Sequence, residues 1–570
     1  MKRSGAQIVW DVLAQQGVEV VFGYPGGAIM PVYDAMMGQS VVRHVLVRHE
    51  QGAAHMADGY ARASGRVGVA LATSGPGATN LVTGIATAMM DSSPLVAITG
   101  QVSSPFLGTD AFQETDITGV TLPITKHNEL VTKAERIAPA LHEAFHIARS
   151  GRPGPVLVDI CKDAQQALIE YEPRVAAERV FRQPADLPDF ETEFARALEL
   201  IERAERPVIL AGQGILRANG MAALRAFAEK TGIPIAVTLL GIGAFPATHP
   251  QNLGMMGMHG EAWVNQAIQD ADLLIALGMR FDDRVTGNLK TYARRAKKIH
   301  VELDPAEINK NVRVDAALVG DVREVLERFI AQVPARNCDA WASHIRTGKG
   351  DASVRDIQSL PHHGKLHAAH VMHDLWRLTE GKALVVTDVG QHQMWEAQYY
   401  KHDYPRKLIT SGGLGTMGFA LPAAIGARFA MPDDDIWVVV GDGGFQMTAA
   451  ELSTCAQEGL KINIAVINNG YLGMVRQWQQ FFYEGRYAAT PLKNPDFVKL
   501  AEAHGLVGLR VSRREDIADA FRTAKQTPQT VLVEFQVEQE DSVYPMVPSG
   551  ADLQDMIRRP TPLVETAQDA

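Results

Sequence analysis

Residues 436–469 read IWVVVGDGGFQMTAAELSTCAQEGLKINIAVINN, and this stretch decides the fold. IWVVV has the continuous apolar character of a buried strand, GDGG is typical of a turn, and TAAELSTCAQEG has the composition of a helix. The second apolar run, INIAVI, predicts another strand. A strand, a helix and a strand in this order form a βαβ unit, so the two strands are expected to lie parallel in one sheet.

A polar residue ends each of these two strands. Asp442 follows the first strand and Asn469 follows the second. Because the carboxyl ends of parallel strands meet at one edge of the sheet, both residues are expected where open α/β sheets bind ligands. The glycines and the helix start favour a phosphate there, but Asp442 would repel it unless a cation lay between them. Mg²⁺ prefers oxygen ligands, so the stretch predicts a magnesium and phosphate site.

Length, composition and charge exclude several classes of protein. The chain has 570 residues, which predicts about two to four domains. Its net charge of −10 argues against a nucleic-acid partner. It has no apolar run of about 18 residues, and its N-terminus is amphipathic rather than signal-like, so we expect a cytoplasmic protein without a membrane span. Three distant cysteines argue against a disulfide frame.

Strand-like runs alternate with helical stretches in three blocks, which predicts three doubly wound parallel-sheet α/β domains. We expect a first domain at 1–170, a second at 191–335, a third at 363–545 and a tail at 546–570. The polar stretches 171–190 and 337–364 are interpreted as linkers. The first and third blocks can share a fold without sharing sequence. The expected strands are 19–23, 42–48, 67–74, 95–100, 154–160, 207–212, 233–238, 272–278, 297–304, 383–390, 407–412, 436–443, 462–469 and 530–537.

Glu50 follows one of these strands and opens an Ala- and Gly-rich helical stretch, EQGAAHMADGYARASG. One interpretation is that it caps the helix N-terminus, where a carboxylate is favourable. The other is that an apolar site keeps its carboxyl group protonated, so that it can donate a hydrogen bond during catalysis. Taken alone, the residues favour capping.

Further motifs relate the chain to known enzymes. The strand–GDG–helix–strand–NN pattern resembles the thiamine diphosphate signature of the pyruvate-decarboxylase-like enzymes, and RHEQGAAHMADGYAR resembles their catalytic glutamate segment. Over nearly the whole chain, the motifs resemble in order the catalytic subunits of the acetohydroxyacid (acetolactate) synthase family. These motifs are FGYPGGAIMPVYDA, TSGPGATNL, GTDAFQETD, TKHNELV, SGRPGPVLVD, GMHG, RFDDRVTG, VGQHQMW, SGGLGTMGF and LGMVRQW.

The resemblance implies a biosynthetic carboligase. Such an enzyme decarboxylates pyruvate and joins it to pyruvate or 2-ketobutyrate, giving 2-acetolactate or 2-aceto-2-hydroxybutyrate for valine, leucine and isoleucine biosynthesis. The implied cofactors are thiamine diphosphate, Mg²⁺ and an FAD held by the central Rossmann-like domain. The FAD would be structural, because the reaction has no net redox change. A homodimer or tetramer with its active site between subunits, and a small regulatory subunit, are the implied assembly.

The resemblance also assigns residues. Glu50, Gln113 and Lys126 are the implied catalytic residues, Phe112 and Trp478 the implied substrate pocket, and Asp442, Asn469 and the Tyr471 carbonyl the implied metal ligands. Trp478 would favour 2-ketobutyrate by gripping its extra methylene. Thiamine diphosphate is expected against Tyr24, Pro25, Gly26, Glu50, Val389, Gly390, Gln391, His392, Gly415, Met417, Gly441, Asp442, Gly443, Gly444, Asn469, Tyr471, Gly473 and Met474. FAD is expected against Arg152, Gly212, Gly214, Thr238, Leu239, His259, Gly278, Arg280, Asp282, Arg284, Glu302, Leu303, Asp321 and Val322.

Three alternatives stay open at this point. A pyruvate oxidase has the same fold and passes electrons to FAD, a catabolic acetolactate synthase lacks flavin, and a regulatory relative lacks activity. The RFDDRVTG, GMHG and RQW motifs favour the synthase over the oxidase. Glu50, Asp442 and Asn469 argue against a relative without activity. The sequence leaves open whether the assembly is a dimer or a tetramer, and what the tail does.

Overall fold

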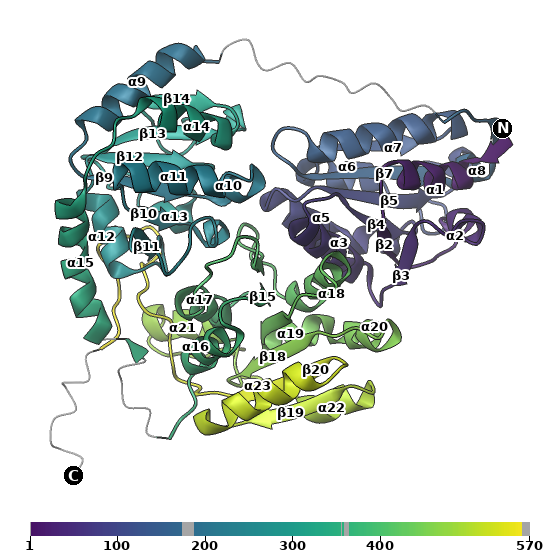
Figure 1. Ribbon diagram of the computed structural model, residues 1–570. Helices are drawn as coiled ribbons and strands as arrows, with labels where there is room; N and C mark the ends of the chain where they lie inside the picture. The colour runs from purple at the N-terminus through teal and green to yellow at the C-terminus, as the bar shows by residue number, and fades with distance from the viewer. Residues whose placement is uncertain (1, 174–186, 355, 358–363, 561–570) are drawn as a thin grey trace.

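The computed structural model describes residues 2–173, 187–354, 356–357 and 364–560 (Figure 1). Within them, three six-stranded parallel sheets follow one another along the chain, each covered by helices. A two-stranded antiparallel sheet pairs β1 (Lys2–Ser4) with β8 (Leu168–Glu170). The predicted fold class, three doubly wound α/β domains, is confirmed.

The first sheet has the strand order β3-β2-β4-β5-β7-β6. One face packs on α1 and α7, and the other packs on α3 and α5 (Figure 1). The strands are β2 (Val20–Gly23), β3 (Arg43–Leu46), β4 (Gly68–Ala72), β5 (Leu95–Gln101), β6 (His127–Val131) and β7 (Pro155–Cys161). The helices are α1 (Gly5–Gln15), α2 (Met30–Met36), α3 (Glu50–Ser64), α4 (Pro76–Asn80), α5 (Val82–Met90), α6 (Ile117–Thr121), α7 (Ala134–Arg149) and α8 (Lys162–Gln166).

The third sheet repeats this topology with the order β16-β15-β17-β18-β20-β19. Numbered within each domain, both sheets read 2-1-3-4-6-5, so the two domains share one strand order. The strands are β15 (Leu384–Thr387), β16 (Leu408–Thr410), β17 (Ile436–Gly441), β18 (Asn463–Asn468), β19 (Val507–Val511) and β20 (Val531–Gln536). The helices are α16 (Ala368–Thr379), α17 (Gln391–Tyr399), α18 (Ala420–Ala430), α19 (Asp442–Thr448), α20 (Leu452–Gln457), α21 (Gly473–Phe482), α22 (Phe497–Ala503) and α23 (Ile517–Gln526).

The second sheet is different. Its order β11-β10-β9-β12-β13-β14 reads 3-2-1-4-5-6 within the domain, which is the order of the dinucleotide-binding Rossmann fold. The strands are β9 (Pro207–Ala211), β10 (Ile235–Val237), β11 (Asn252–Met255), β12 (Leu273–Leu277), β13 (Lys297–Glu302) and β14 (Ala316–Val319). The helices are α9 (Phe190–Arg203), α10 (Gln213–Arg217), α11 (Met221–Thr231), α12 (Ala262–Asp270), α13 (Asp283–Thr286) and α14 (Val322–Gln332).

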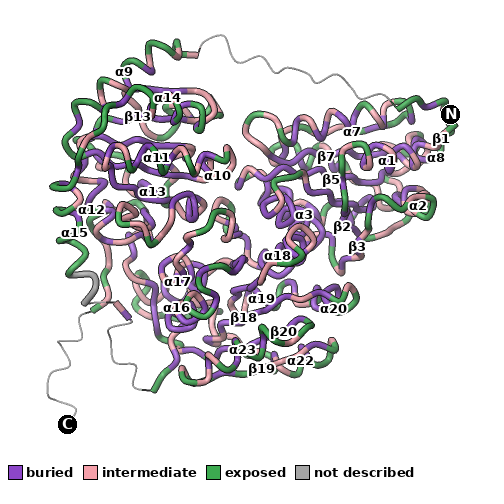
Figure 2. The backbone as a smooth tube through the Cα atoms, in the orientation of Figure 1, coloured by how far each residue is buried: buried purple, intermediate pink, exposed green. Residues whose placement is uncertain are grey.

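Helices α3 and α18 join the first and third domains. Both are buried over most of their length (Figure 2), and one apolar cluster runs from the first sheet through them to the third. Glycines allow the close approach: a Cβ atom at Gly59 would lie 2.0 Å from the Ala423 carbonyl oxygen, and one at Gly426 would lie 1.8 Å from that of Met56. The third domain is therefore fixed against the helix that begins with Glu50.

In the three parallel sheets, four strands were not predicted from the sequence: β6, β11, β14 and β19; the short strands β1 and β8 of the antiparallel sheet were not predicted either. Each lies at the edge of its sheet. An edge strand pairs on one side only and is less completely buried, so β6, for example, reads HNELV and lacks the apolar run of a central strand.

The segment 337–364, expected to be a linker, contains a helix, α15 (Asp339–Val354), so this interpretation was wrong over that range. Trp341 and Ile345 are one turn apart and pack on the second domain, and the Trp341 indole donates to the Pro207 carbonyl at 3.1 Å. Residues 174–186 of the other predicted linker, and 355 and 358–363 of this one, lie outside the described residues. No helix in the described ranges is long and apolar enough to cross a membrane.

Candidate active site

Asp442 stands at the carboxyl end of β17, as the first residue of α19. Its side chain is buried, and its Oδ2 atom accepts hydrogen bonds from the backbone N–H of Gly470 at 2.9 Å and from the Asn494 amide at 2.6 Å. Burial raises the pKa of Asp442 to about 6, although the Asn494 and Gly470 donors act in the opposite direction. Among the described residues, amide and backbone donors hold this carboxylate and no basic side chain pairs with it, which leaves its charge available to a cation.

Asn469 lies beside Asp442, as the spacing predicted. Gly470, whose φ of 71° is left-handed, links them by turning the chain so that its N–H meets Asp442. The Asn469 side-chain oxygen accepts from the backbone N–H of Tyr471 at 3.1 Å, and its amide donates to Gln391 at 3.2 Å. The ends of β17 and β18 are thus one hydrogen-bonded unit.

Asn494 was missed by the sequence analysis. Its amide donates to Asp442 and to the side chain of Asn468, and its oxygen accepts from Gln446 at 3.0 Å. It comes from a loop beyond α21, far along the chain from the two strands. A lone Asn in a loop carries no motif, so only the folded structure reveals its contact with Asp442.

The glycines around this edge are required by close packing. A Cβ atom at Gly444 would lie 2.4 Å from the Asp388 carboxylate, and one at Gly473 would lie 2.2 Å from the Gln391 side-chain oxygen. A Cβ at Gly443 would meet Leu472 at 2.7 Å, and one at Gly441 would meet the His392 ring at 2.9 Å. At these positions a side chain would collide with neighbouring side chains, so only glycine allows this packing.

Gln391 and His392, both expected to contact thiamine diphosphate, already have hydrogen-bond partners within the protein. Gln391 donates to Gln477 at 2.9 Å and to the Asp541 carbonyl at 3.2 Å. His392 is buried, which lowers the pKa of its imidazole to about 3, and its Nε2 atom accepts from the backbone N–H of Gly441 at 3.3 Å. His392 is therefore neutral, and its contact with thiamine diphosphate stays a prediction.

Glu50 stands at the corresponding edge of the first sheet, as the first residue of α3. Its side chain is buried and accepts a hydrogen bond from the Asn80 amide at 2.9 Å. Gly77 approaches so closely that a Cβ there would lie 3.2 Å from the Glu50 carboxyl. Helix capping is done by its neighbour, because the His49 side chain accepts from the backbone N–H of Gln51.

The residues expected near the substrate do not form a closed pocket in the single chain. Phe112 is 88% exposed, and Gln113 has a left-handed φ of 61°. Tyr24, which was expected to contact thiamine diphosphate, is 41% exposed. Lys126 donates to the Ile147 and Ser150 carbonyls at the end of α7, the latter at 2.6 Å. Desolvation lowers the pKa of Lys126 to about 8, against the opposing effect of Asp304. In this chain Lys126 caps a helix, and its contact with substrate stays a prediction.

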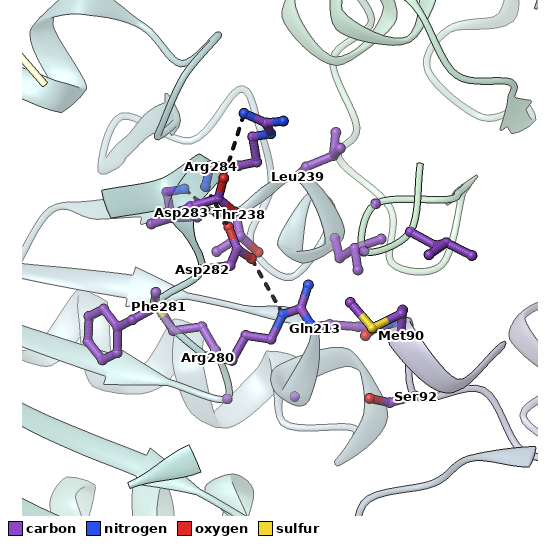
Figure 3. Close-up of a pocket in the computed structure, with 18 of the residues that line it drawn as sticks. Met90, Ser92, Gln213, Thr238, Leu239, Arg280, Phe281, Asp282, Asp283 and Arg284 are labelled. Atoms are coloured by element: carbon purple, nitrogen blue, oxygen red, sulfur yellow. Dashed lines mark hydrogen bonds and ion pairs between the residues drawn. The ribbon is translucent and has the colours of Figure 1, made fainter. Parts of the chain in front are cut away.

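A cavity of about 1150 Å³ opens at the carboxyl edge of the second sheet (Figure 3). All residues predicted to contact FAD line it, except Gly212. Gly212 lies just behind, where a Cβ would be 2.2 Å from the Gly278 carbonyl oxygen. Figure 3 shows Arg280 reaching toward Asp282 and Arg284 toward Asp283, with Met90 and Ser92 of the first domain opposite.

Charged groups of both signs line this cavity. Burial raises the pKa of Glu302 to about 7, although it accepts from the backbone N–H of Leu303 at 2.9 Å and of Asp304 at 3.3 Å. Arg152 reaches in from the first domain and pairs with Glu307 at 2.7 Å. Desolvation lowers the pKa of His259 to about 4, so it is neutral at pH 7.

The cavity continues to the third domain. Val389, Gly390, Gly415, Met417 and Met474 line it, and so does Trp478 on α21. The Trp478 ring packs edge-on against Phe482 at 5.3 Å between centroids. Five of the residues expected to contact thiamine diphosphate thus line the same cavity as the residues expected to contact FAD.

Comparisons with known proteins identify the family. Models of the thiamine pyrophosphate enzymes match the N-terminal TPP binding domain over 3–120, the central domain over 194–329 and the C-terminal TPP binding domain over 388–535. Acetolactate synthase of Mycobacterium bovis is 50% identical, covering 96% of this chain and 90% of the relative. The chain belongs to the acetolactate synthase family.

Two further members agree with this. The acetolactate synthase large subunit of Corynebacterium glutamicum is 48% identical, with 97% of this chain and 90% of the relative covered. The acetolactate synthase isozyme 2 large subunit of Escherichia coli K12 is 47% identical, with 98% of this chain and 100% of the relative covered. The predicted membership of the acetolactate synthase family is confirmed, and its first and third domains are the thiamine pyrophosphate-binding domains.

Proposed function

We propose that this chain is the catalytic subunit of an acetolactate synthase, which decarboxylates pyruvate and joins it to a second 2-keto acid, pyruvate or 2-ketobutyrate. Identity near 50% over almost the whole chain to enzymes of that name carries the proposal. The paired strand ends at Asp442 and Asn469 support it, because they supply oxygen atoms at a glycine-lined edge.

Thiamine diphosphate and Mg²⁺ fit the third domain. In the described chain no cluster of three or more His, Cys, Asp and Glu side chains could hold a metal. The proposed ligands are instead one carboxylate (Asp442), one amide oxygen (Asn469) and the Tyr471 carbonyl, which leaves positions for diphosphate oxygens. Bound thiamine diphosphate would supply the electron sink for decarboxylation.

Different side chains of this protein would then donate the proton, support the cofactor and contact the substrate. Glu50 would hold a proton and donate it to a ring nitrogen of the cofactor, in a position that Asn80 fixes. Met417 and Gly415 would support the cofactor from the cavity side. Trp478 would form an apolar wall of the substrate pocket, with Phe112, Gln113 and Lys126 of a second copy closing it.

FAD is proposed for the cavity of the second domain. The Rossmann strand order, the tight contact between Gly214 and Gly278, and Glu302 at the end of β13 are the features that hold a dinucleotide. A volume of about 1150 Å³ suits a ligand of that size. We propose a structural role for the flavin, because carboligation needs no electron acceptor.

A second copy of the chain is proposed to complete the active site. Phe112 and Tyr24, both assigned to the site by family resemblance, are exposed in the single chain. A homodimer would cover them and would bring Glu50 of one copy to the cofactor of the other; a tetramer of such dimers is equally compatible. A small regulatory subunit is a further proposed partner, since the relatives are named large subunits.

The test is a product assay with purified protein, pyruvate, Mg²⁺ and thiamine diphosphate, with and without added FAD. Acetolactate, converted to acetoin by acidification, is the expected product, and the flavin absorbance should stay unchanged during turnover. Acetate formation with bleaching of the flavin would instead indicate a pyruvate oxidase. A colourless protein that is fully active without FAD would contradict the flavin proposal.

A further inference from the structure

The loop 411–417 carries two of the proposed cofactor-binding residues, Gly415 and Met417, between β16 and α18. It lines the cavity on one side. Within its own domain it is held by the Thr416 N–H, which donates to the Ser411 hydroxyl at 3.0 Å, and at its end by Gly418 N–H, which donates to Asp388 at 3.0 Å. The tip at Gly412 and Gly413 is held from another domain.

Asp91 of the first domain holds that tip. It directly follows α5, and its side chain is fully buried. Its Oδ1 atom accepts from the backbone N–H of Gly413 at 2.6 Å, and its Oδ2 atom accepts from that of Gly412 at 3.3 Å. The approach is close enough to require glycine: a Cβ at Gly413 would lie 2.7 Å from Oδ1 of Asp91 and 2.8 Å from the Met90 carbonyl oxygen.

Arg62, in the last turn of α3, orients Asp91. Its Nη2 atom donates to Asp91 at 2.8 Å, and its Nη1 atom donates to the Thr410 carbonyl at 2.6 Å, immediately before the loop. The same guanidinium binds Asp58 through two bonds of 2.7 and 2.9 Å. One arginine therefore ties together the end of α3, the end of α5 and the end of β16.

A second contact between the same elements supports this arrangement. The hydroxyl of Thr87, on α5, meets that of Thr416 at 2.7 Å. Both ion pairs of Arg62 are buried, and the one to Asp58 is bidentate, so removing one partner leaves an uncompensated charge. The first domain thus clamps the loop at both its tip and its base.

We propose that Asp91 is a positioning residue for cofactor binding, which fixes the loop 411–417 so that Gly415 and Met417 stand against thiamine diphosphate. The inference rests on the proposed function, since it concerns the same site. It gives the first domain a second task besides carrying Glu50, because α3 begins with Glu50 and ends with the arginine that holds this clamp.

The test compares Asp91→Asn with Asp58→Asn in the full-length protein. Both variants remove one of the two carboxylates of Arg62, but only Asp91→Asn disturbs the bonds to Gly412 and Gly413. Amide hydrogen exchange of the peptide covering 411–417 is measured without cofactor. Thiamine diphosphate affinity is then measured with saturating Mg²⁺ by quenching of tryptophan fluorescence.

Asp91→Asn should speed exchange of that peptide and weaken thiamine diphosphate binding, each about tenfold, as expected for losing hydrogen bonds to a charged acceptor. Asp58→Asn should leave affinity within about twofold of wild type, even where it lowers the unfolding temperature as much. Gly413→Ala disturbs the same contact between Asp91 and the loop by changing the loop residue, and it leaves the side chains that bind Arg62 unchanged. It should give the same losses as Asp91→Asn, and it replaces that variant as the test if Asp91→Asn folds poorly.

Wild-type exchange and affinity in both Asp91→Asn and Gly413→Ala would overturn the proposal, and so would equal losses in Asp91→Asn and Asp58→Asn. A wild-type protein that binds no thiamine diphosphate would refute the proposed function instead, and the exchange rates would still decide whether Asp91 holds the loop.

Discussion

The first and third sheets have the same strand order, yet their carboxyl edges carry different chemistry. In the third domain, Asp442 is surrounded by donors from three separate segments, and the glycines beside it allow Leu472 and Asp388 to pack closely. In the first domain, Glu50 accepts from Asn80 and faces small residues. The strand order fixes where a ligand meets the sheet, and the residues at the strand ends decide what that edge does to it.

The second sheet is the contrast to both. Its Rossmann order and its large cavity, lined by Glu302 and several arginines, suit a dinucleotide rather than a reacting group. If this division is right, substitutions at the three edges should have separable effects on proton transfer, on cofactor binding and on stability.

The largest effect is expected for Glu50→Gln. The substitution keeps the shape and the bond from Asn80 but removes the titratable proton, so kcat should fall about 10³-fold, as when a general acid is lost. Thiamine diphosphate affinity and the unfolding temperature should change little. Steady-state acetolactate formation and calorimetric binding measure the two quantities.

Near wild-type turnover in Glu50→Gln would mean that Glu50, at the carboxyl edge of the first sheet, has no catalytic role. Asp34→Asn, at a carboxylate on α2 outside the proposed site, serves as the matched control and should leave kcat unchanged.

Asp442→Asn should act on binding rather than on proton transfer. Losing the only anionic protein ligand proposed for Mg²⁺ should weaken Mg²⁺-dependent binding of thiamine diphosphate about 10²-fold, as expected for a metal-ligand change. Titration of the cofactor at several Mg²⁺ concentrations measures this. Excess Mg²⁺ should recover part of the activity.

Unchanged Mg²⁺ dependence in Asp442→Asn would contradict the proposal that Asp442, at the edge of the third sheet, binds the metal. Asp496→Asn, at the N-cap of α22 in the same domain, removes a carboxylate outside the site and is the comparison.

Trp478→Leu should change selectivity with little loss of turnover. The shorter side chain gives up part of the apolar wall, so preference for 2-ketobutyrate over pyruvate should fall roughly tenfold, within the range for one methylene. The ratio of 2-aceto-2-hydroxybutyrate to acetolactate from mixed substrates reports it. Phe482→Leu alters the ring that packs on Trp478 but lies outside the cavity lining, and a similar shift in that variant would contradict a direct contact.

The sequence predicted the central strands of all three sheets and the meeting of Asp442 with Asn469. These features rest on local patterns: apolar runs and a fixed spacing across one βαβ unit. It did not predict four of the six edge strands, β6, β11, β14 and β19, of which β6 clearly lacks that pattern, or α15, where two buried side chains in a polar helix are decisive. Asn494 and Asp91 were also missed, because each acts on a segment distant in the sequence and neither stands in a motif.

The smallest effect is expected for Glu302→Gln, at the edge of the second sheet. The pKa of Glu302 is raised to about 7 from its ordinary value of 4.5, mainly by burial. Between these two pH values the folded protein binds more protons than the unfolded chain, so this carboxyl group lowers stability as pH rises through that window. The full shift corresponds to about 3 kcal/mol, and contact with solvent reduces this to roughly 1–2 kcal/mol.

Removing the charge should therefore raise the unfolding midpoint of the flavin-free protein at pH 8 and leave it nearly unchanged at pH 4.5. Chemical unfolding at the two pH values measures the difference. FAD affinity should fall in the same variant, because a carboxylate at this strand end is the group that accepts from a ribose hydroxyl. Equal midpoints at pH 8 would mean that Glu302 is an ordinary solvated acid. Undiminished FAD affinity would mean that Glu302 does not contact the flavin. Higher stability together with weaker FAD binding in Glu302→Gln would mean that the charge of Glu302 destabilises the folded protein and serves to bind FAD. The edge of the second sheet would then differ from the other two, where the acidic residue serves proton transfer or metal binding.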